Sequence, residues 1–416
     1  MATLDVSAFS NVLKTLYPQS YMNRLVYENN PFLGMVPKYT KFGGNNLRIS
    51  LQYGVPQGRS ASFAKAQANK TTGKYEGFLL TRVRDYSLAS IDGETIEASQ
   101  GDSNSLVRAS KAEFDGALHS IKRSLATSLF RSGSGSMGQV SAGGTSGTTL
   151  TLLDPNDIVN FEVGMTLVAS STDGGGTIGT VTEVIDSLDR DNGTMDVASG
   201  TWDAEFAASY YIFVEGDHDA KLSGLDAWIP ATVTSTSFFG VDRTKDTTRL
   251  GGVRVIADAA KDGDIQRTLI RAAARVAREG GSPDCIMVNH DVWQLLVKEI
   301  GLATEYNKRP AVDGTGKQVA DIAYKSIVLQ GPTGSMDIIP DHNCQRNLAW
   351  MLQLNTWKCY SLNEAPHFLN LDGRNFLREA SADSYEARIG YYAQLGCSAP
   401  GWNCRVDLTN VLPAAS

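Results

Sequence analysis

The chain has 416 residues, of which 42% are hydrophobic and 20% charged, and its net charge is −7. This composition excludes a largely disordered chain and predicts two to four globular domains. No apolar run approaches the ~20 residues of a membrane span. The N-terminus lacks the basic and then apolar pattern of a secretory signal. The sequence therefore predicts a protein that is neither secreted nor embedded in a membrane.

The charge is distributed unevenly along the chain. Residues 41–86 contain eight basic and two acidic residues, a net charge of +6. Residues 133–221 contain two basic and fourteen acidic residues, a net charge of −12. The first segment favours anionic neighbours, whereas the second favours water or a cationic partner.

Residues 1–40 resemble an arm without a core of its own. Proline residues interrupt the two short helical patterns of this segment. Its apolar side chains recur without enough neighbours to form a core, and we expect them to pack on another surface: Leu25, Phe32, Leu33 and Met35.

Residues 41–90 predict a long two-stranded ribbon. Apolar and polar residues alternate over 47–53 and again over 79–88, while 54–77 is rich in small and polar residues. Because an isolated ribbon is only marginally stable, it needs a partner surface, although a solvated flexible hairpin is the alternative. The basic residues predict an acidic partner: Arg48, Arg59, Lys65, Lys70, Lys74, Arg82 and Arg84.

A long helix is predicted over Ser103–Arg131. Apolar or small residues recur every three or four positions over this stretch. Asp102 and Ser103 can cap its first turn, and Gly133 ends it. At 1.5 Å per residue the helix is roughly 40 Å long, so other parts of the chain must pack along it. An ordinary core helix of an α+β domain is the alternative.

The acidic segment predicts an inserted β-domain. A Gly- and Ser-rich tract from Gly133 to Gly147 marks its boundary. Asn192-Gly193 predicts a type I′ hairpin turn. Strand-like runs separated by turn residues occupy 148–153, 165–168, 178–185, 194–197 and 210–214.

The remainder predicts a mixed α+β order rather than a regular βα alternation. Asp264 caps a helix that ends at Gly280, Cys285–Val288 is a buried strand, and Asn289 caps a helix that ends at Ile300. Residues 301–322 resemble a loop. Later strands are predicted over 326–329, 336–339, 348–354, 357–360, 385–394 and 406–408.

Motifs for catalysis and cofactor binding are missing. Gly174–Gly179 matches G-x-G-x-x-G, but the alternating residues after it predict a strand rather than a nucleotide-binding helix. Ser62–Lys65 matches S-x-x-K without its companion motifs. The sequence contains no G-x-S-x-G, H-E-x-x-H or P-loop. We therefore predict no enzyme activity, no catalytic residues and no cofactor.

Metal and sequence-specific DNA sites are also not expected. His218 lies among Glu215, Asp217 and Asp219, but no second His or Cys is near in sequence, so a solvated acidic strand end is favoured. Residues Asp186, Asp189 and Asp191 do not have the spacing of a calcium loop. Basic residues are not interleaved with aromatic ones as in nucleic-acid motifs. The five cysteines are predicted to be reduced and buried, since they are odd in number and form no C-x-x-C pair: Cys285, Cys344, Cys359, Cys397 and Cys404.

The order of these parts resembles the major capsid proteins of tailed bacteriophages, the Hong Kong 97-type shell fold shared with encapsulins. An arm and a basic hairpin, both without a core, precede a long helix and an α+β body. Local matches are Gly224–Pro230, the step from 264–280 into Cys285–Leu296, and Tyr385–Gln394 followed by Val406-Asp-Leu.

The resemblance implies a division of the chain into shell-fold parts. These are an N-terminal arm (1–40), an extended loop (41–90), the spine helix of a peripheral domain (91–135), the inserted acidic β-domain (136–220), a continuation of the peripheral domain (221–263), an axial domain (264–347) and a return to the peripheral domain (348–416).

The resemblance also implies function and partners. The chain would assemble with itself into hexamers and pentamers of an icosahedral head that encloses double-stranded DNA without sequence-specific contacts. The assembled protein would lie in the virion capsid and form in the host cytoplasm, with a portal protein and a separate scaffolding protein as partners. A decoration protein is left open. Alternatives are an encapsulin-like nanocompartment shell and, less favoured, a hydrolase with an accessory β-domain.

Three features depart from the minimal family pattern. The acidic insertion is extra, and its charge predicts that it projects outward, away from packaged DNA. Only residues 1–40 precede the loop, which implies that scaffolding is a separate protein. Some family members cross-link a loop lysine to a neighbour, for which Lys65, Lys70 and Lys74 are candidates by location only.

Overall fold

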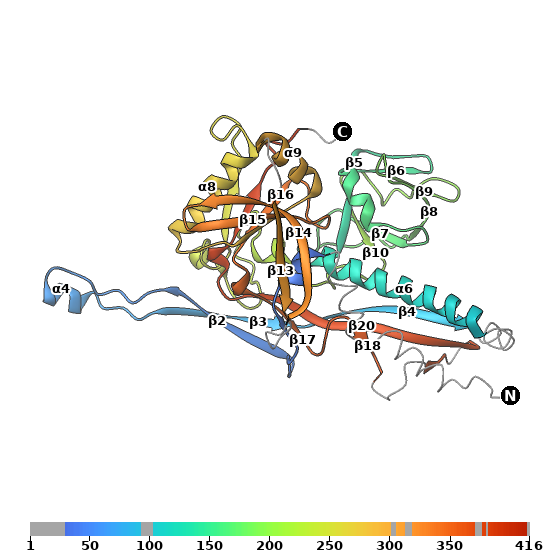
Figure 1. Ribbon diagram of the computed structural model, residues 1–416, viewed down its shortest axis with the longest axis horizontal. Coiled ribbons are helices and arrows are strands. Elements are labelled where there is room, and N and C mark those ends of the chain that lie inside the picture. Colours follow the sequence, from blue (N-terminus) through green and yellow to red (C-terminus); the bar gives the residue numbers. More distant parts are fainter. Residues whose placement is uncertain are drawn as a thin grey trace.

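The long helix α6 (Ser103–Ser128) lies along two paired strands, β4 (Val83–Asp92) and β20 (Ser384–Cys397). The computed structural model describes residues 30–92, 103–300, 305–312, 318–370, 377–379 and 382–413. Figure 1 shows a central body, a thin hairpin that projects from one end, and a small barrel beside the body at the other end.

The predicted helix is present and packs through the predicted face. Phe114, Leu118, Ile121 and Leu125 are all at most 3% exposed. The helix ends at Ser128, three residues before the predicted end, and continues as a turn in which the Arg131 N–H donates to the Ser128 carbonyl. Asp102, one of the two predicted capping residues, lies outside the described residues.

The sheet under α6 has six strands, all organised around β20. The path is β1-β17-β20-β18, and β4 and β19 also pair with β20. Strand β20 pairs antiparallel with β4 along the whole length of β4. The other bounds are β1 (Lys38–Tyr39), β17 (Trp357–Ser361), β18 (His367–Phe368) and β19 (Leu377–Arg378).

A second, seven-stranded sheet forms the rest of the body, in the order β11-β21-β16-β12-β15-β14-β13. Helices α8 (Ile265–Arg278) and α9 (His290–Ile300) pack on it (Figure 1). The strands are β11 (Val253–Ile256), β12 (Cys285–Val288), β13 (Glu305–Val312), β14 (Gln318–Gly331), β15 (Gly334–Pro340), β16 (Leu348–Leu352) and β21 (Cys404–Asp407).

The predicted caps of these two helices are confirmed. The Asp264 carboxylate accepts from the Arg267 N–H at 2.7 Å, and the Asn289 side-chain oxygen accepts from the Asp291 N–H at 3.0 Å. Strand β12 is buried at every position, as its composition predicted. Short helical turns complete the body: α7 (Leu225–Trp228), η3 (Arg243–Asp246), η4 (Leu354–Thr356) and η5 (Pro400–Trp402).

The loop predicted over 301–322 is wrong. Strands β13 and β14 pair antiparallel there, from Glu305 opposite Ser326 to Val312 opposite Gln318. Pro310 and the polar composition of β13 argued against a strand. A proline is tolerated because β13 is the edge strand of the sheet, where an N–H on the outer side needs no partner strand.

The predicted inserted β-domain is a closed six-stranded barrel, in the order β10-β5-β6-β9-β8-β7. Its interior is apolar and includes Val140, Leu150, Phe161 and Met195. The elements are β5 (Ser136–Ser146), β6 (Thr149–Leu152), η2 (Pro155–Asn160), β7 (Thr166–Ser170), β8 (Glu183–Asp189), β9 (Thr194–Val197) and β10 (Tyr211–Val214).

Two details of the barrel differ from expectation. The tract from Gly133 to Gly147 is not only a boundary, because β5 occupies most of it, with Ser136, Gly138 and Val140 facing inward. Asn192-Gly193 is not a two-residue turn, since Asp189 pairs with Thr194 across a four-residue loop. The Asp189 carboxylate accepts hydrogen bonds from the backbone N–H groups of Asp191 and Asn192 in that loop. These bonds favour a four-residue loop over a two-residue turn.

Candidate intersubunit surface

The hairpin is built from β2 (Asn46–Gly54) and β3 (Lys74–Thr81), which pair antiparallel. Both bounds differ from the prediction, which joined β3 and β4 into one strand over 79–88. The chain changes partner at Arg82, because β20 offers β4 a longer strand to pair with. One short helix, α3 (Pro31–Met35), precedes the hairpin in the chain, and another, α4 (Phe63–Ala68), lies between its two strands.

An aromatic cluster anchors the base of the hairpin. Phe78 is fully buried, and its ring centroid lies 5.0 Å from that of Trp228 and 6.2 Å from that of Phe238. The Trp228 indole N–H donates to the Leu395 carbonyl at 3.1 Å, which connects this cluster to β20. The base is therefore part of the body's core.

Polar contacts also hold the base. The Lys245 ammonium pairs with the Glu76 carboxylate at 2.5 Å, and the Arg249 guanidinium donates to the Tyr53 carbonyl at 2.6 Å. The Leu79 N–H donates to the Phe239 carbonyl at 2.9 Å. These contacts extend along both strands as far as Tyr53 and Glu76.

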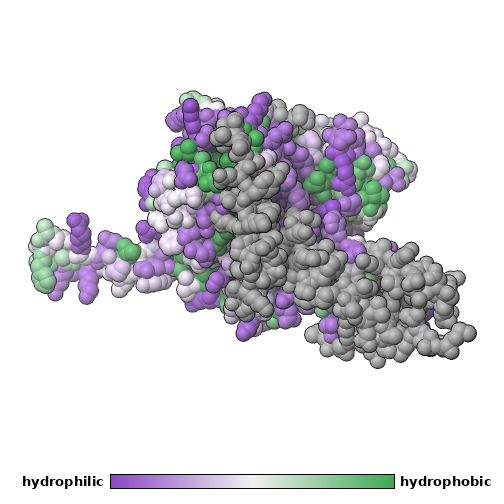
Figure 2. Space-filling view, viewed as in Figure 1, coloured by the Kyte–Doolittle hydropathy of each residue, from purple (hydrophilic) through white to green (hydrophobic). Residues whose placement is uncertain are grey.

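Beyond the base the hairpin has no core. No residue from Gln52 to Gly77 is buried. Helix α4 lies at the tip, and Phe63 on it is 83% exposed; Tyr75 is 65% and Val55 57% exposed. Figure 1 shows the hairpin projecting from the body, and Figure 2 shows hydrophobic residues at its tip beside hydrophilic ones. Exposed apolar side chains on a segment without a core mark an interaction surface.

The positive charge of the hairpin is not neutralised within the chain. The two acidic residues of 41–86, Glu76 and Asp85, pair with Lys245 and Lys221 of other segments. Six of the seven predicted contact residues are exposed and have no ion-pair partner within the ranges that the structure describes: Arg48, Arg59, Lys65, Lys70, Lys74 and Arg84.

Arg82 differs from the other six. Its guanidinium donates to the Phe42 carbonyl at 2.5 Å and lies 5.0 Å from the centroid of the Phe42 ring. Phe42 is fully buried, so Arg82 covers the chain's own core. Arg82 therefore has a role within the chain, and its expected contact with another subunit stays a prediction.

The arm residues that were expected to pack on another surface lie against the body of the same chain where the structure describes them. Phe32 and Leu33 are 0% and 2% exposed, and Phe32 packs on Phe130 with ring centroids 5.3 Å apart. Met35 packs partly buried against the same core. These residues find apolar neighbours from distant segments, which local sequence could not reveal. Leu25 lies outside the described residues.

Sequence reasoning missed Phe63 and Tyr75 as contact residues. Both are aromatic residues within a polar stretch that cannot form a core, and this contrast was the available signal. The basic residues alone predicted the positive charge of the hairpin surface but not its exposed aromatic side chains.

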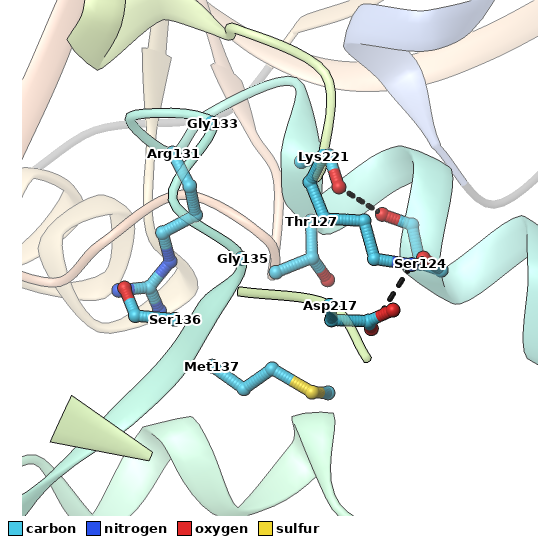
Figure 3. Close-up of a pocket in the computed structure, with 10 residues that line it drawn as sticks. Ser124, Thr127, Arg131, Gly133, Gly135, Ser136, Met137, Asp217 and Lys221 are labelled. Carbon is cyan, nitrogen blue, oxygen red and sulfur yellow. Dashed lines mark hydrogen bonds and ion pairs between the residues drawn. The ribbon is translucent and has the colours of Figure 1, made fainter. Parts of the chain in front are cut away.

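The barrel is attached to the body through a partly buried ion cluster. The Lys221 ammonium lies 2.8 Å from the Asp85 carboxylate, 3.0 Å from the Asp217 carboxylate and 2.9 Å from the Ser124 hydroxyl. Figure 3 shows Lys221, Ser124 and Asp217 around a small cavity of about 30 Å³ at the end of α6. Burial raises the pKa of Asp217, an effect that Lys221 opposes.

A larger cavity of about 370 Å³ lies between the barrel, the end of α6 and the second sheet. Its arginines are matched by carboxylates: Arg131 pairs with Asp157 at 2.5 Å, and Arg405 with Asp226 at 3.6 Å. Burial raises the pKa of Asp157 and of Asp226, and the arginines partly oppose this. The Arg131–Asp157 pair connects the end of α6 to η2 of the barrel, whereas the Arg405–Asp226 pair lies within the body.

The structure also places the glycine-rich motif and His218, which the sequence analysis singled out. Gly174 and Gly175 adopt positive φ in the connection between β7 and β8, and no helix follows Gly179. His218 contacts the Phe213 ring, with centroids 4.9 Å apart. Within the described residues there is no group of three His, Cys, Asp or Glu side chains placed to hold a metal ion.

All five cysteines are buried and unpaired with one another, as predicted. Burial raises the pKa of Cys359 to about 11 and those of Cys397 and Cys404 to about 12. Since the thiolate is the reactive form, these thiols are poor nucleophiles.

No protein-family profile and no curated protein sequence matches the chain. Solved structures that resemble it include the capsid asymmetric unit of cyanophage A-1(L), at 12% identity and a TM-score of 0.48 over 91% of this chain and 92% of that one. The capsid of a native GTA particle gives 8% identity and a TM-score of 0.45, covering 90% and 89%. The holo-SrpI encapsulin complex of Synechococcus elongatus gives 8% and 0.44, covering 98% and 96%.

These structures are of the kind that the sequence order resembles. Of the helices in the described ranges, none has the length and hydrophobicity that a membrane crossing requires.

Proposed function

We propose that the chain is a structural shell protein, the major capsid protein of a tailed phage, which assembles with copies of itself into hexamers and pentamers of an icosahedral head. The head would enclose double-stranded DNA, with a scaffolding protein and a portal protein as assembly partners. The proposed location is the virion capsid, and the peripheral and axial domain boundaries given above are part of the proposal.

The observation that carries this proposal is the projecting hairpin. Its base is fixed in the core by Phe78 and Trp228, so its direction is set by the fold. Its outer part exposes Phe63 and uncompensated lysines and buries nothing. A segment that is held firmly at one end and uncovered at the other is suited to contact a second copy.

A shell role also agrees with the chemistry of the described residues. The buried thiols have raised pKa values, and the arginines of the larger cavity are paired with carboxylates. Neither supplies the activated nucleophile that a hydrolase needs.

The barrel is proposed to lie on the outer side of the shell. Its segment carries a net charge of −12, which would be repelled by packaged DNA within a Debye length of ~8 Å. A reconstruction of the particle with the barrel on the inner wall would refute this placement.

The test is assembly of the full chain, expressed alone and with a candidate scaffolding protein. Large fractions are examined by negative-stain electron microscopy. Closed shells or capsomer rings are the expected result, whereas folded monomers under both conditions would contradict a shell role. The variant Lys65→Glu/Lys70→Glu/Lys74→Glu should lower particle yield, and an unchanged yield would contradict the role of the hairpin.

A further inference from the structure

The hairpin and the barrel lie on opposite flanks of the chain (Figure 1). Copies that associate head to tail into a ring use two different surfaces, so a projection on one flank meets the opposite flank of the next copy. If the proposed ring-forming function holds, the flank that carries α6 and the barrel faces the hairpin of a neighbour.

The barrel exposes apolar side chains on that flank. Val163 is 62% exposed and Val184 51% exposed. The two are close in the backbone, because the Gly164 N–H donates to the Ile185 carbonyl at 2.8 Å and Val184 pairs with Thr166 of β7. Figure 2 shows hydrophobic residues on the visible face of the barrel among hydrophilic ones.

Carboxylates border this apolar patch. Asp186, Asp189 and Asp191 follow Val184 along β8 and its loop, and all three are exposed. The Asp189 carboxylate accepts hydrogen bonds from Asn192, which lower its pKa and keep it ionised. No ion pair within the described chain uses these three carboxylates. Two cations near the patch, Arg190 and Arg123, both pair with Glu162.

The hairpin tip offers the complementary groups. Phe63 supplies an exposed aromatic ring, and Lys65 follows it on α4. Lys70 and Lys74 continue the positive charge toward β3. An apolar centre with opposite charges around it combines burial of apolar surface with a charge pattern that fixes the docking direction.

Another exposed surface fits less well. A cavity of about 330 Å³ at the hairpin base is lined by Val55, Arg249 and Trp402. It lies on the same flank as the hairpin and carries a cation of its own. A head-to-tail neighbour would not present its hairpin there.

We propose that the hairpin tip of one copy docks on the barrel of a neighbouring copy, with Phe63 against Val163 and Val184 and with Lys65, Lys70 and Lys74 opposite Asp186, Asp189 and Asp191. This inference rests on the proposed shell function and names the receptor surface within it.

The test uses cysteine pairs in assembled particles of the full chain. All five native cysteines are buried, so the background is low. The double variant Ala64→Cys/Val184→Cys is treated with a bis-maleimide and resolved under denaturing conditions. We expect covalent dimers and higher oligomers. The matched control Ala64→Cys/Ile256→Cys uses a residue that is 64% exposed on the other flank, and it should remain monomeric.

A charge exchange provides an independent measurement. Lys65→Glu/Lys70→Glu/Lys74→Glu should lose most of the particle fraction, and adding Asp186→Lys/Asp189→Lys/Asp191→Lys should restore it. Particles that form but show no tip-to-barrel cross-link and no rescue would overturn the inference and leave the shell function standing. A chain that folds but never assembles would overturn both.

Discussion

The ammonium of Lys221 lies 2.8 Å from the carboxylate of Asp85, which joins the segment that leaves the barrel to strand β4. The Tyr391 hydroxyl donates to the same carboxylate at 3.3 Å, and the Ser124 hydroxyl donates to it at 2.6 Å. The barrel, the long helix and the sheet therefore meet at one carboxylate.

Removing Lys221 should destabilise the fold. In Lys221→Ala, Asp85 and Asp217 become two partly buried carboxylates without their cation, so we expect a loss of about 2 kcal/mol in the free energy of unfolding. Urea unfolding of the unassembled chain measures this. Lys261→Ala is the control, because its side chain is 77% exposed in its pair with Asp258, and we expect little change in stability from its removal. Equal effects would contradict the importance of the cluster.

Two phenylalanines of the same hairpin should behave in opposite ways. Phe78→Ala removes a fully buried ring and should cost about 3–5 kcal/mol of stability. Phe63→Ala removes a ring that is 83% exposed, so stability of the monomer should stay within ~0.5 kcal/mol while particle yield falls. Thermal unfolding and electron microscopy measure the two effects. An unchanged particle yield for Phe63→Ala would remove it from the contact surface.

Gly135 should not tolerate a side chain. Its φ is +89°, and a Cβ would collide with the Asp217 carbonyl oxygen. Gly135→Ala should therefore cost more than the ~1 kcal/mol expected from positive φ alone. Gly147→Ala isolates the conformational term, since φ is +62° there and nothing lies within 4 Å of the added Cβ. The midpoints of chemical denaturation of the two variants are compared. Similar midpoints would show that the backbones at Gly135 and Asp217 can move apart to admit the side chain.

Lys38 should make stability depend on alkaline pH. Burial lowers its pKa from 10.5 to about 8, although its ammonium donates to the Leu33 carbonyl at 2.5 Å and to the Gly34 carbonyl at 2.9 Å. Below pH 8 the proton is bound in both states. Between pH 8 and 10.5 only the unfolded chain retains it, so the free energy of unfolding should rise with pH, by about 3 kcal/mol across this window.

The comparison for Lys38 is Lys38→Met. Urea midpoints of both unassembled proteins are measured from pH 7 to pH 10. The difference between the two proteins should move in favour of the native chain as the pH rises through this window. A difference that does not change with pH would show that Lys38 keeps its ordinary pKa.

Elements with strong local signals were predictable. The apolar period of α6, the Asp264 cap of α8 and the apolar run of β12 each define an element from neighbouring residues alone. The barrel was predictable as a unit because turn residues separate its strands, and the basic, coreless character of the hairpin followed from its composition.

Elements that depend on distant partners were not predictable. Strand β13 contains Pro310 and is accepted at a sheet edge that local sequence does not reveal. Phe32 is buried by Phe130, which lies far along the chain. Arg82 turns to Phe42 instead of outward. In each case contacts with residues distant in the sequence determined a structure that the local sequence pattern did not specify.

The two ends of the barrel segment leave the body at one point. The Gly224 N–H donates to the Arg131 carbonyl at 3.0 Å, and the Leu225 N–H donates to the Leu129 carbonyl at 2.7 Å. A closed domain between adjacent ends can be exchanged for another without altering the topology of the rest. The junction thus suits the chain to carrying a foreign antigen or enzyme as a replaceable module, which would be repeated at every subunit of the proposed particle.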